Sequence, residues 1–220
     1  MTSTRTAEEL RLDLTGGLAQ AIAGKGYAAT TIADIVMHAR VSKRTFYEHF
    51  ADKEACLMAL YEQGCEQLLS VVRGAAGEGG RPWKEMINDW VTAYLTALES
   101  MPAVTRTLLV EIQAAGPKAF RLRQQMQRRF ADALVEVVEE ARAADPAIPR
   151  LSPLLAIALV GGVHEMMLQV SDPYTGAGPS FTSLTPAVDE LVYAILTNPW
   201  AVSGGMTGPE RSGGRTPRME

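Results

Sequence analysis

Residues Tyr27–Lys53, YAATTIADIVMHARVSKRTFYEHFADK, decide the fold that the sequence predicts. Thr31 precedes Asp34 by three residues, which approximates a capping box: a hydroxyl accepts from free amides and a carboxylate lies near the positive helix end. Ser42 can cap the next helix, Lys43–Phe50, in the same way. The stretch therefore predicts a helix, a tight turn and a second short helix.

The second helix of this unit is only about eight residues long, too short to persist in water without packing. Phe46 and Phe50, at positions i and i+4, are the natural core pair. The other faces carry two cations, two hydroxyls and an imidazole, which suit contacts with phosphates and the major groove. These side chains are Lys43, Arg44, Thr45, Tyr47 and His49.

The pattern T-T-I-x-D-I-x-x-x-A-x-V-S-K-x-T-F-Y-x-H-F-x-x-K-E closely resembles the tetracycline-repressor (TetR) family of bacterial regulators, over residues 7–60. The resemblance implies a homodimeric DNA-binding repressor that leaves a pseudo-palindromic operator when a small molecule binds a second domain. It places Arg44 as the best candidate base reader. Contacts with double-stranded DNA are expected from Thr31, Arg40, Ser42, Lys43, Arg44, Thr45, Tyr47, His49 and Lys53.

One residue departs from the family pattern. Where the family commonly has glycine in the turn, this chain has Arg40. If the turn needs a left-handed backbone, arginine adds a penalty on the order of 1 kcal/mol. Another phosphate contact from the guanidinium would offset that penalty.

Composition is that of an ordinary soluble protein: 220 residues, 47% hydrophobic and 21% charged. A run of about eighteen apolar residues and a hydrophobic signal core are both missing from the sequence, so it predicts a cytoplasmic protein with no membrane partner. Cys56 and Cys65 lie nine residues apart on one expected helix, on opposite faces. They are therefore expected to be free thiols.

The charge distribution matters more than the total. A net charge of −4 and a pI near 5.5 argue against a generally basic nucleic-acid binder. Residues 1–55 hold seven basic and seven acidic residues, whereas residues 56–202 hold eleven against sixteen. Arg40, Lys43 and Arg44 form a local basic patch, so we expect DNA binding that is steeply sensitive to salt.

Apolar residues recur at helical spacing along most of the chain, which predicts an all-α fold. We expect an N-terminal three-helix helix-turn-helix DNA-binding domain at residues 1–55. A C-terminal helical ligand-binding and dimerisation domain is expected at 56–198, and a disordered tail at 199–220. Helices are expected near residues 7–24, 32–38, 43–50, 53–73, 82–100, 104–115, 118–144, 152–170 and 185–197.

The second domain is rich in methionine and large aromatic residues, which suit an adaptable apolar pocket. We expect a lipophilic effector. Its charge stays open, because Glu111 or Glu165 would favour a cation and the arginines of the 118–144 helix an acid. The candidate ligand-binding residues are Trp83, Met86, Trp90, Tyr94, Met101, Glu111, Gln113, Phe120, Met126, Phe130, His164 and Met167, although each alone also fits plain core or surface.

The 152–170 helix is apolar nearly all round, so we expect burial on two sides and a four-helix contact between two copies. The candidate interface residues are Leu155, Leu159, Val163, Leu191 and Ile195.

Two other classes of function compete with a ligand-controlled regulator. An enzyme is disfavoured because His38, His49 and His164 are scattered, without metal-ligand spacing, and the sequence has no phosphate loop or nucleophile elbow. We therefore expect no metal, no cofactor and no catalysis. A constitutive DNA binder with a packed, ligand-insensitive core is the other alternative.

Overall fold

The computed structural model describes residues 5–74, 82–171 and 180–197. This part of the chain contains helices and no strand, which confirms the all-α prediction. The expected tail, most of the glycine-rich break after Arg73 and much of the 171–183 loop lie outside it. The helices are α1 (Ala7–Ala29), α2 (Ile32–Ala39), α3 (Lys43–His49), α4 (Lys53–Gly74), α5 (Trp83–Ser100), α6 (Pro102–Leu109), α7 (Pro117–Ala144), α8 (Pro153–Val170) and α9 (Thr185–Thr197).

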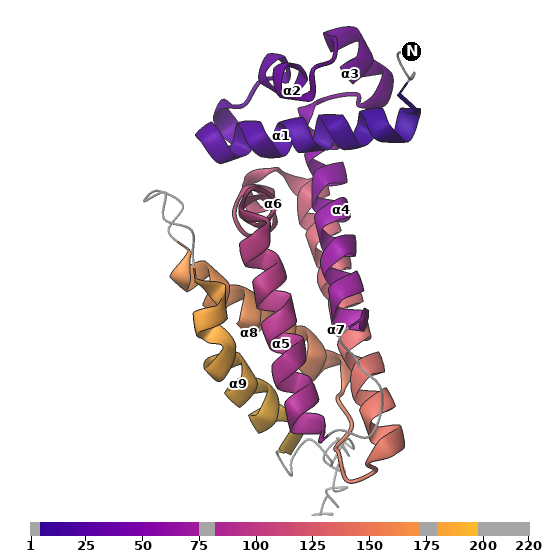
Figure 1. Ribbon diagram of the computed structural model, residues 1–220, viewed down its shortest axis with the longest axis vertical. Helices are drawn as coiled ribbons and strands as arrows, with labels where there is room; N and C mark the ends of the chain where they lie inside the picture. Colours follow the sequence, from indigo (N-terminus) through magenta and orange to yellow (C-terminus); the bar gives the residue numbers. More distant parts are fainter. Residues whose placement is uncertain (1–4, 75–81, 172–179, 198–220) are drawn as a thin grey trace, which may run out of the picture.

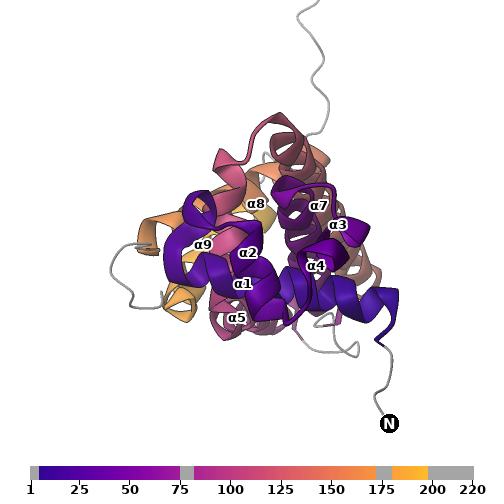
Figure 2. The same cartoon turned by 90° about the horizontal axis from the view of Figure 1, so that it is seen from above.

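The first three helices form a unit at one end of an elongated molecule (Figure 1). Helix α1 lies across the end of the long helices, and α2 and α3 lie on its outer side (Figures 1 and 2). Thr6 and Glu9 form a capping box at the start of α1. Gly26 has φ +75° and kinks the helix there, but helical backbone resumes up to Ala29, slightly beyond the predicted end.

The core of this unit is made by fully buried side chains from all three helices: Leu18 and Ile22 of α1, Ile35 of α2 and Phe46 of α3. Gly17 allows α1 to approach α2 closely, since a Cβ there would lie 2.6 Å from the carbonyl oxygen of Ile35. The short helix α3 is therefore packed on the other two helices, as the sequence predicted.

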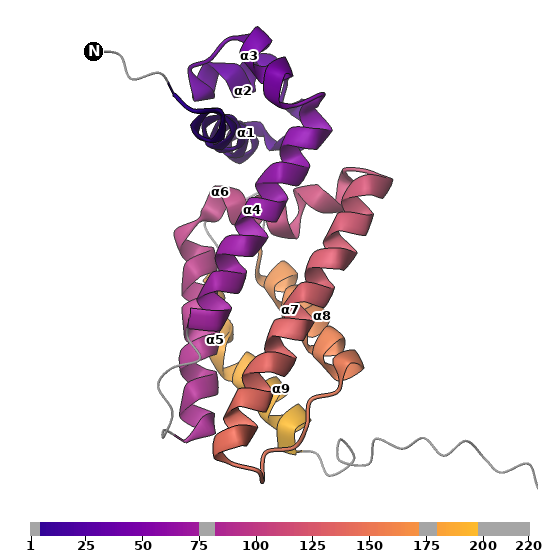
Figure 3. The same cartoon turned by 90° about the vertical axis from the view of Figure 1, so that its right-hand side faces the viewer.

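Helix α4 joins the unit to the rest of the molecule (Figure 3). Its start is capped by Asp52, whose carboxylate accepts from the Ala55 amide at 2.7 Å. Its first turns pack on α1 and its later turns on α5, α6 and α7. Cys56 and Cys65 are buried free thiols, as predicted.

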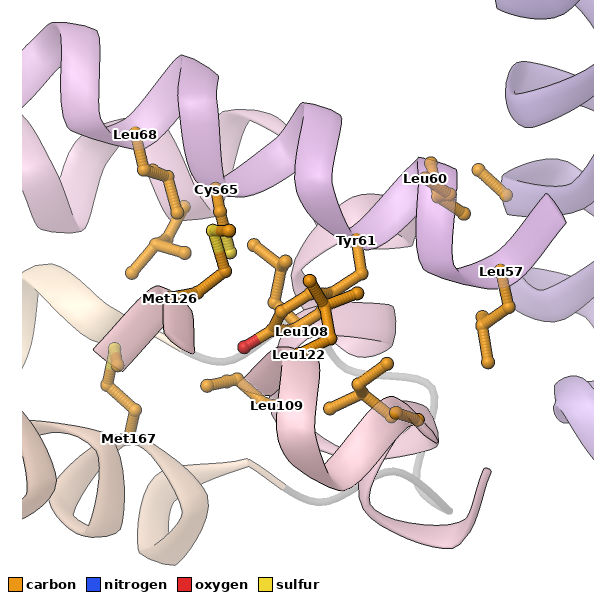
Figure 4. Close-up of a cluster of buried hydrophobic side chains, with 14 of the residues drawn as sticks. Leu57, Leu60, Tyr61, Cys65, Leu68, Leu108, Leu109, Leu122, Met126 and Met167 are labelled. Atoms are coloured by element: carbon orange, nitrogen blue, oxygen red, sulfur yellow. The ribbon is translucent and has the colours of Figure 1, made fainter. Parts of the chain in front are cut away.

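The second part of the molecule is a bundle of α4–α9. Helix α5 ends at Ser100 and Pro102 starts α6, where the sequence predicted a break. The next helix is shorter than predicted: α6 ends at Leu109, and a 3-10 helix follows at Glu111–Ala114. Figure 4 shows side chains from α4, α6, α7 and α8 filling the upper interior, among them Tyr61, Cys65, Met126 and Met167.

Helix α8 is covered on one side by its own protomer, and the side that the prediction assigns to a second copy is exposed in the single chain. Leu159 and Met167 face the interior, whereas Leu154 is 79% exposed and Ile157 is 39% exposed. Pro153–Val170 is also long and apolar enough to cross a membrane by length and composition, a test that core helices of soluble proteins pass too. The apolar outer face is therefore left without a partner inside the described chain.

Candidate functional site

The outer helix α3 presents polar side chains to solvent. The Ser42 hydroxyl accepts from the Thr45 amide at 3.0 Å and caps the helix, as predicted. Phe46 is fully buried and holds the opposite face down, with the Tyr47 ring edge-on to it at 5.5 Å. Lys43 and Arg44 and the 57% exposed Tyr47 consequently point away from the protein.

Arg44 is held only loosely. Its Nε atom pairs with Glu48 at 3.0 Å, and the two side chains are 89% and 54% exposed. An exposed pair one helical turn apart is worth less than about 1 kcal/mol. The guanidinium can therefore exchange Glu48 for an acceptor on DNA.

Arg40 adopts a left-handed conformation, with φ 54° and ψ 46°, so the turn has the backbone for which the sequence raised a penalty at arginine. The turn is closed by a bond from the Val41 amide to the Val36 carbonyl at 3.1 Å. The Arg5 guanidinium donates to the Arg40 carbonyl at 3.3 Å. The Arg40 side chain stays exposed beside α3, free to reach a phosphate.

Lys53 lies at the junction of α1 and α4. Its ammonium donates to the carbonyls of Tyr27 and Thr30, at 2.8 and 2.7 Å, and lies 4.2 Å from the centre of the Tyr27 ring. Burial lowers the pKa of Lys53; burial, followed by Glu54 and Asp52, raises the pKa of Tyr27 to about 12. The structure thus gives this lysine a helix-joining role.

Two other expected DNA contacts are also bonded within the protein, Thr31 through its side chain and His49 through its backbone carbonyl only. The Thr31 hydroxyl donates to the Asp34 carboxylate at 2.6 Å, and Lys25 pairs with the same carboxylate at 2.7 Å. These bonds, Lys25 first, hold the pKa of Asp34 well below its usual range. The carbonyl of half-buried His49 accepts from Arg11 at 3.0 Å.

The second domain contains an apolar cavity of about 50 Å³. Of the expected ligand residues, Trp83, Met86 and Trp90 line it, together with Leu159 from the expected interface set. The remaining lining residues were not among the expected ligand residues. They are Ile87, Leu134, Val137, Val138, Ala141, Ile148, Leu151, Val192 and Leu196. The spacing of apolar residues by three and four on α7 could have identified those that α7 contributes.

Other expected ligand residues lie next to this cavity. Tyr94 stacks on Trp90 with ring centroids 6.2 Å apart and meets Phe130 edge-on at 6.2 Å. Burial raises the pKa of the Tyr94 phenol, yet the side chain keeps some accessible surface. Met126 and Met167 are buried in the adjoining interior (Figure 4).

Five expected ligand residues are not brought to the cavity. Glu111 pairs with Arg106 at 3.0 Å, and Gln113 donates to the Leu109 carbonyl at 2.6 Å. Phe120 is 55% exposed, and Met101 lies at the joint between α5 and α6. His164 lies elsewhere in the interior of the bundle, on α8.

The expected interface residues face mainly into their own protomer. Leu159 is 3% exposed and has almost no surface to offer a second chain. Leu155, Val163, Leu191 and Ile195 are half-buried against the core. The large apolar residues that are exposed on α8 and α9 are instead Leu154, Ile157, Val170 and Tyr193.

Within residues 5–74, 82–171 and 180–197, the structure holds no group of three or more His, Cys, Asp or Glu side chains placed for a metal.

A capped helix-turn-helix at one end of a helical bundle defines an all-α protein of the helix-turn-helix class. Residues 17–60 match the family model described as "Bacterial regulatory proteins, tetR family", which confirms the resemblance seen in the sequence. The N-terminal unit is a TetR-family helix-turn-helix domain.

Two HTH-type transcriptional regulators of Bacillus subtilis (strain 168) are similar in sequence. YxbF is 30% identical over 100 residues, which are 46% of this chain and 25% of YxbF. YerO is 26% identical over 151 residues, 66% of this chain and 50% of YerO. The chain thus spans at most half the length of these curated relatives, and the matches support a DNA-binding regulator.

Solved structures share the fold over most of the chain. FadR from Bacillus subtilis, in complex with stearoyl-CoA, is 16% identical with a TM-score of 0.66, covering 84% of this chain and 97% of that one. FadR from Bacillus halodurans is 16% identical with a TM-score of 0.70, covering 89% and 99%. The TetR-family regulator PfmR from Thermus thermophilus is 20% identical with a TM-score of 0.62, covering 89% and 97%.

Proposed function

We propose that the protein is a homodimeric DNA-binding transcriptional repressor that binds a pseudo-palindromic operator and is released by a small lipophilic effector. The observation that carries the proposal is helix α3: it is capped by Ser42, held down by Phe46, and presents Lys43, Arg44 and Tyr47 to solvent. A short helix with cations near its N-terminus fits the major groove.

Local charge supports this use of α3. Lys43, Arg44 and Arg40 are all exposed on the outer side of the unit. The second domain carries the excess acid, so DNA is attracted to this end of the molecule alone.

The unpartnered face of α8 supports a dimer. Exposed Leu154 and Ile157 would be buried if α8 and α9 packed on their copies. Gly161 has no atom within 4 Å of a Cβ built on it, so the backbone there is open to close approach. A two-fold dimer would present two α3 helices to an inverted repeat. In this proposal residues 1–55 bind DNA, and residues 56–198 dimerise and bind the effector.

The apolar cavity supports an effector role and constrains it. Its volume of about 50 Å³ is about a third of the roughly 150 Å³ of an engineered apolar cavity that binds benzene. An effector of ordinary size therefore has to select a more open arrangement of α5, α7, α8 and α9. Preferential binding to that arrangement is what would shift the DNA-binding equilibrium. Acyl-chain binding, as in the stearoyl-CoA complex of FadR, is compatible with the apolar lining.

The small cavity equally favours a second candidate, a constitutive DNA-binding regulator whose core stays packed. Ligand-insensitive operator binding would identify it. Catalysis is not part of either proposal.

The decisive experiment selects bound duplexes from genomic fragments at about 0.1 M salt, because phosphate contacts weaken steeply at higher salt. The selected sequence is then footprinted with wild-type protein and with Lys43→Gln. We expect an inverted repeat, protected by wild type and lost with Lys43→Gln. If no sequence is enriched, or the variant protects it equally, the proposed use of α3 is wrong.

A further inference from the structure

Four buried polar atoms in the second domain lack a hydrogen-bond partner among the described residues. Two of them belong to side chains that have a partner through other contacts: Arg142 pairs with Glu139, and Asp189 accepts from Asn88 through its other carboxylate oxygen. The remaining two are Nε of Arg123, on α7, and Nε2 of His164, on α8. Each such group left unpaired costs about 1–3 kcal/mol. The two side chains lie on helices that pack together: Arg123 and His164 come three residues before Met126 and Met167, which face the same interior in Figure 4. Burial first and the charge of Arg123 second lower the pKa of His164. A ligand that paired with them would recover this cost.

Arg123 also lacks a counter-ion in the described part of the chain. Arg129, on the same helix, is paired with Glu66, and Arg142 is paired with Glu139. The acid next to His164 is Glu165, which is exposed and accepts from Gln169 at 2.7 Å. The charge of Arg123 is therefore available to an anion.

Two phenols face the same part of the bundle. Figure 4 shows Tyr61 and Cys65 entering the interior from α4, near Met126 of α7 and Met167 of α8. Tyr94 of α5 meets Phe130 of α7 edge-on. Burial raises the pKa of the Tyr61 phenol, and the charge of Arg123 opposes that shift.

Tyr94 links this part of the interior to the apolar cavity. Tyr94 stacks on Trp90, and Trp90 lines the cavity. A ligand that occupied both would need a charged or polar end and an apolar body.

We propose that the effector is an amphiphile with an anionic head group, a carboxylate or a phosphate, which Arg123 and His164 bind while its apolar body fills the cavity lined by Trp90. This inference rests on the proposed effector function. A cation is disfavoured because Glu111, which would attract it, is already tied to Arg106.

The test compares decanoate, monodecyl phosphate and 1-decanol, which share one apolar chain and differ in head group. Binding is followed by tryptophan fluorescence in a Trp200→Phe background, which leaves Trp83 and Trp90 as reporters. The same titrations are made with Arg123→Gln, with Arg123→Lys, and with the matched control Arg121→Gln, which removes an exposed arginine of α7.

We expect wild type and Arg121→Gln to bind decanoate or decyl phosphate at least about tenfold more tightly than decanol, since bonds to charged groups are the strong ones. Arg123→Gln should lose that preference while keeping decanol binding, and Arg123→Lys should restore part of it. Preference for decanoate over decyl phosphate, or the reverse, identifies which acid the site takes.

Three results would overturn the inference: equal binding of the acids and decanol by wild type, an acid preference that survives Arg123→Gln, or no binding of any decyl compound. Operator binding without added ligand is measured separately. A protein that binds its operator but ignores the head group leaves the DNA-binding proposal standing, whereas failure to bind DNA refutes that proposal alone.

Discussion

Single residues decide how the DNA-binding unit is built and what it can touch. The caps at Thr31 and Ser42 were predictable because a cap needs only a hydroxyl and amides within three residues. The role of Lys53 in joining helices was not predictable, because its partners, the carbonyls of Tyr27 and Thr30, lie more than twenty residues away and become neighbours only in the folded protein.

Arg44 is the residue that we expect to read a base. Its weak pair with Glu48 leaves it free for a bidentate contact with guanine, worth about 1–3 kcal/mol of discrimination. Arg44→Ala should therefore flatten the preference at one operator position, measured by competition with operators changed one base pair at a time. An unchanged preference would remove this role from Arg44.

Arg40 should carry backbone strain. With φ 54° it occupies a conformation that costs a non-glycine residue about 1 kcal/mol. Arg40→Gly should consequently be more stable than Arg40→Ala, since both lack the guanidinium and only alanine keeps the strained Cβ. Urea unfolding of the two variants measures the difference; equal stabilities would show that the turn is relaxed.

His164 should make stability depend on pH. Its folded-state pKa is lowered, by burial and then by Arg123, with Glu165 opposing. Below the unfolded value near 6.5 the unfolded chain therefore binds more protons than the folded one, and stability falls as the pH falls. The stability advantage of wild type over His164→Gln should shrink from pH 8 to pH 5 in urea unfolding; an advantage that is constant with pH would contradict this.

The helices could be predicted from the local sequence, but the contacts between them could not. Proline and glycine positions predicted most boundaries, because their backbone limits act within a few residues. The cavity lining escaped prediction because it combines single faces of α5, α7, α8 and α9, whose register no local pattern reports.

The close packing of α4 on α6 is the contact between helices most open to test. A Cβ on Gly64 would lie 2.6 Å from Val104 Cγ1 and 3.3 Å from Leu108 Cδ2. Gly64→Ala should therefore destabilise the protein by about 1–3 kcal/mol. The matched control is Gly16→Ala in α1, which meets no atom within 4 Å and should be neutral or stabilising by up to about 1 kcal/mol. Thermal unfolding measures the change in melting temperature of each variant. Equal changes would show that α6 can move away from the added methyl group without a cost in stability.

At the scale of the whole molecule, the all-α architecture and the position of the helix-turn-helix could be predicted, because the motif is long and local. The face that would join two copies could not be assigned residue by residue. Helix α8 is apolar nearly all round, so its sequence alone does not say which side its own protomer covers.

Leu154 tests the dimer. It is 79% exposed on α8, so Leu154→Asp removes no internal packing but places a charge on the face that a second copy would cover. We expect a monomer at micromolar concentration and a large loss of operator affinity, measured by sedimentation and by DNA titration. Leu12→Asp, on an exposed apolar residue of α1, is the matched control and should stay dimeric. If the Leu154→Asp protein is still a dimer, the dimer interface does not include this face of α8.

The kink at Gly26 matters for chimeras in which the N-terminal helix-turn-helix unit of one regulator is joined to the second domain of another. A Cβ at this position would lie 3.4 Å from Arg106 Nη2 and 3.4 Å from Glu111 Oε1, so the kink rests against the ion pair at the end of α6. A graft cut at residue 55 would carry the glycine and leave its two charged neighbours behind. Chimeras should therefore transfer Gly26, Arg106 and Glu111 together.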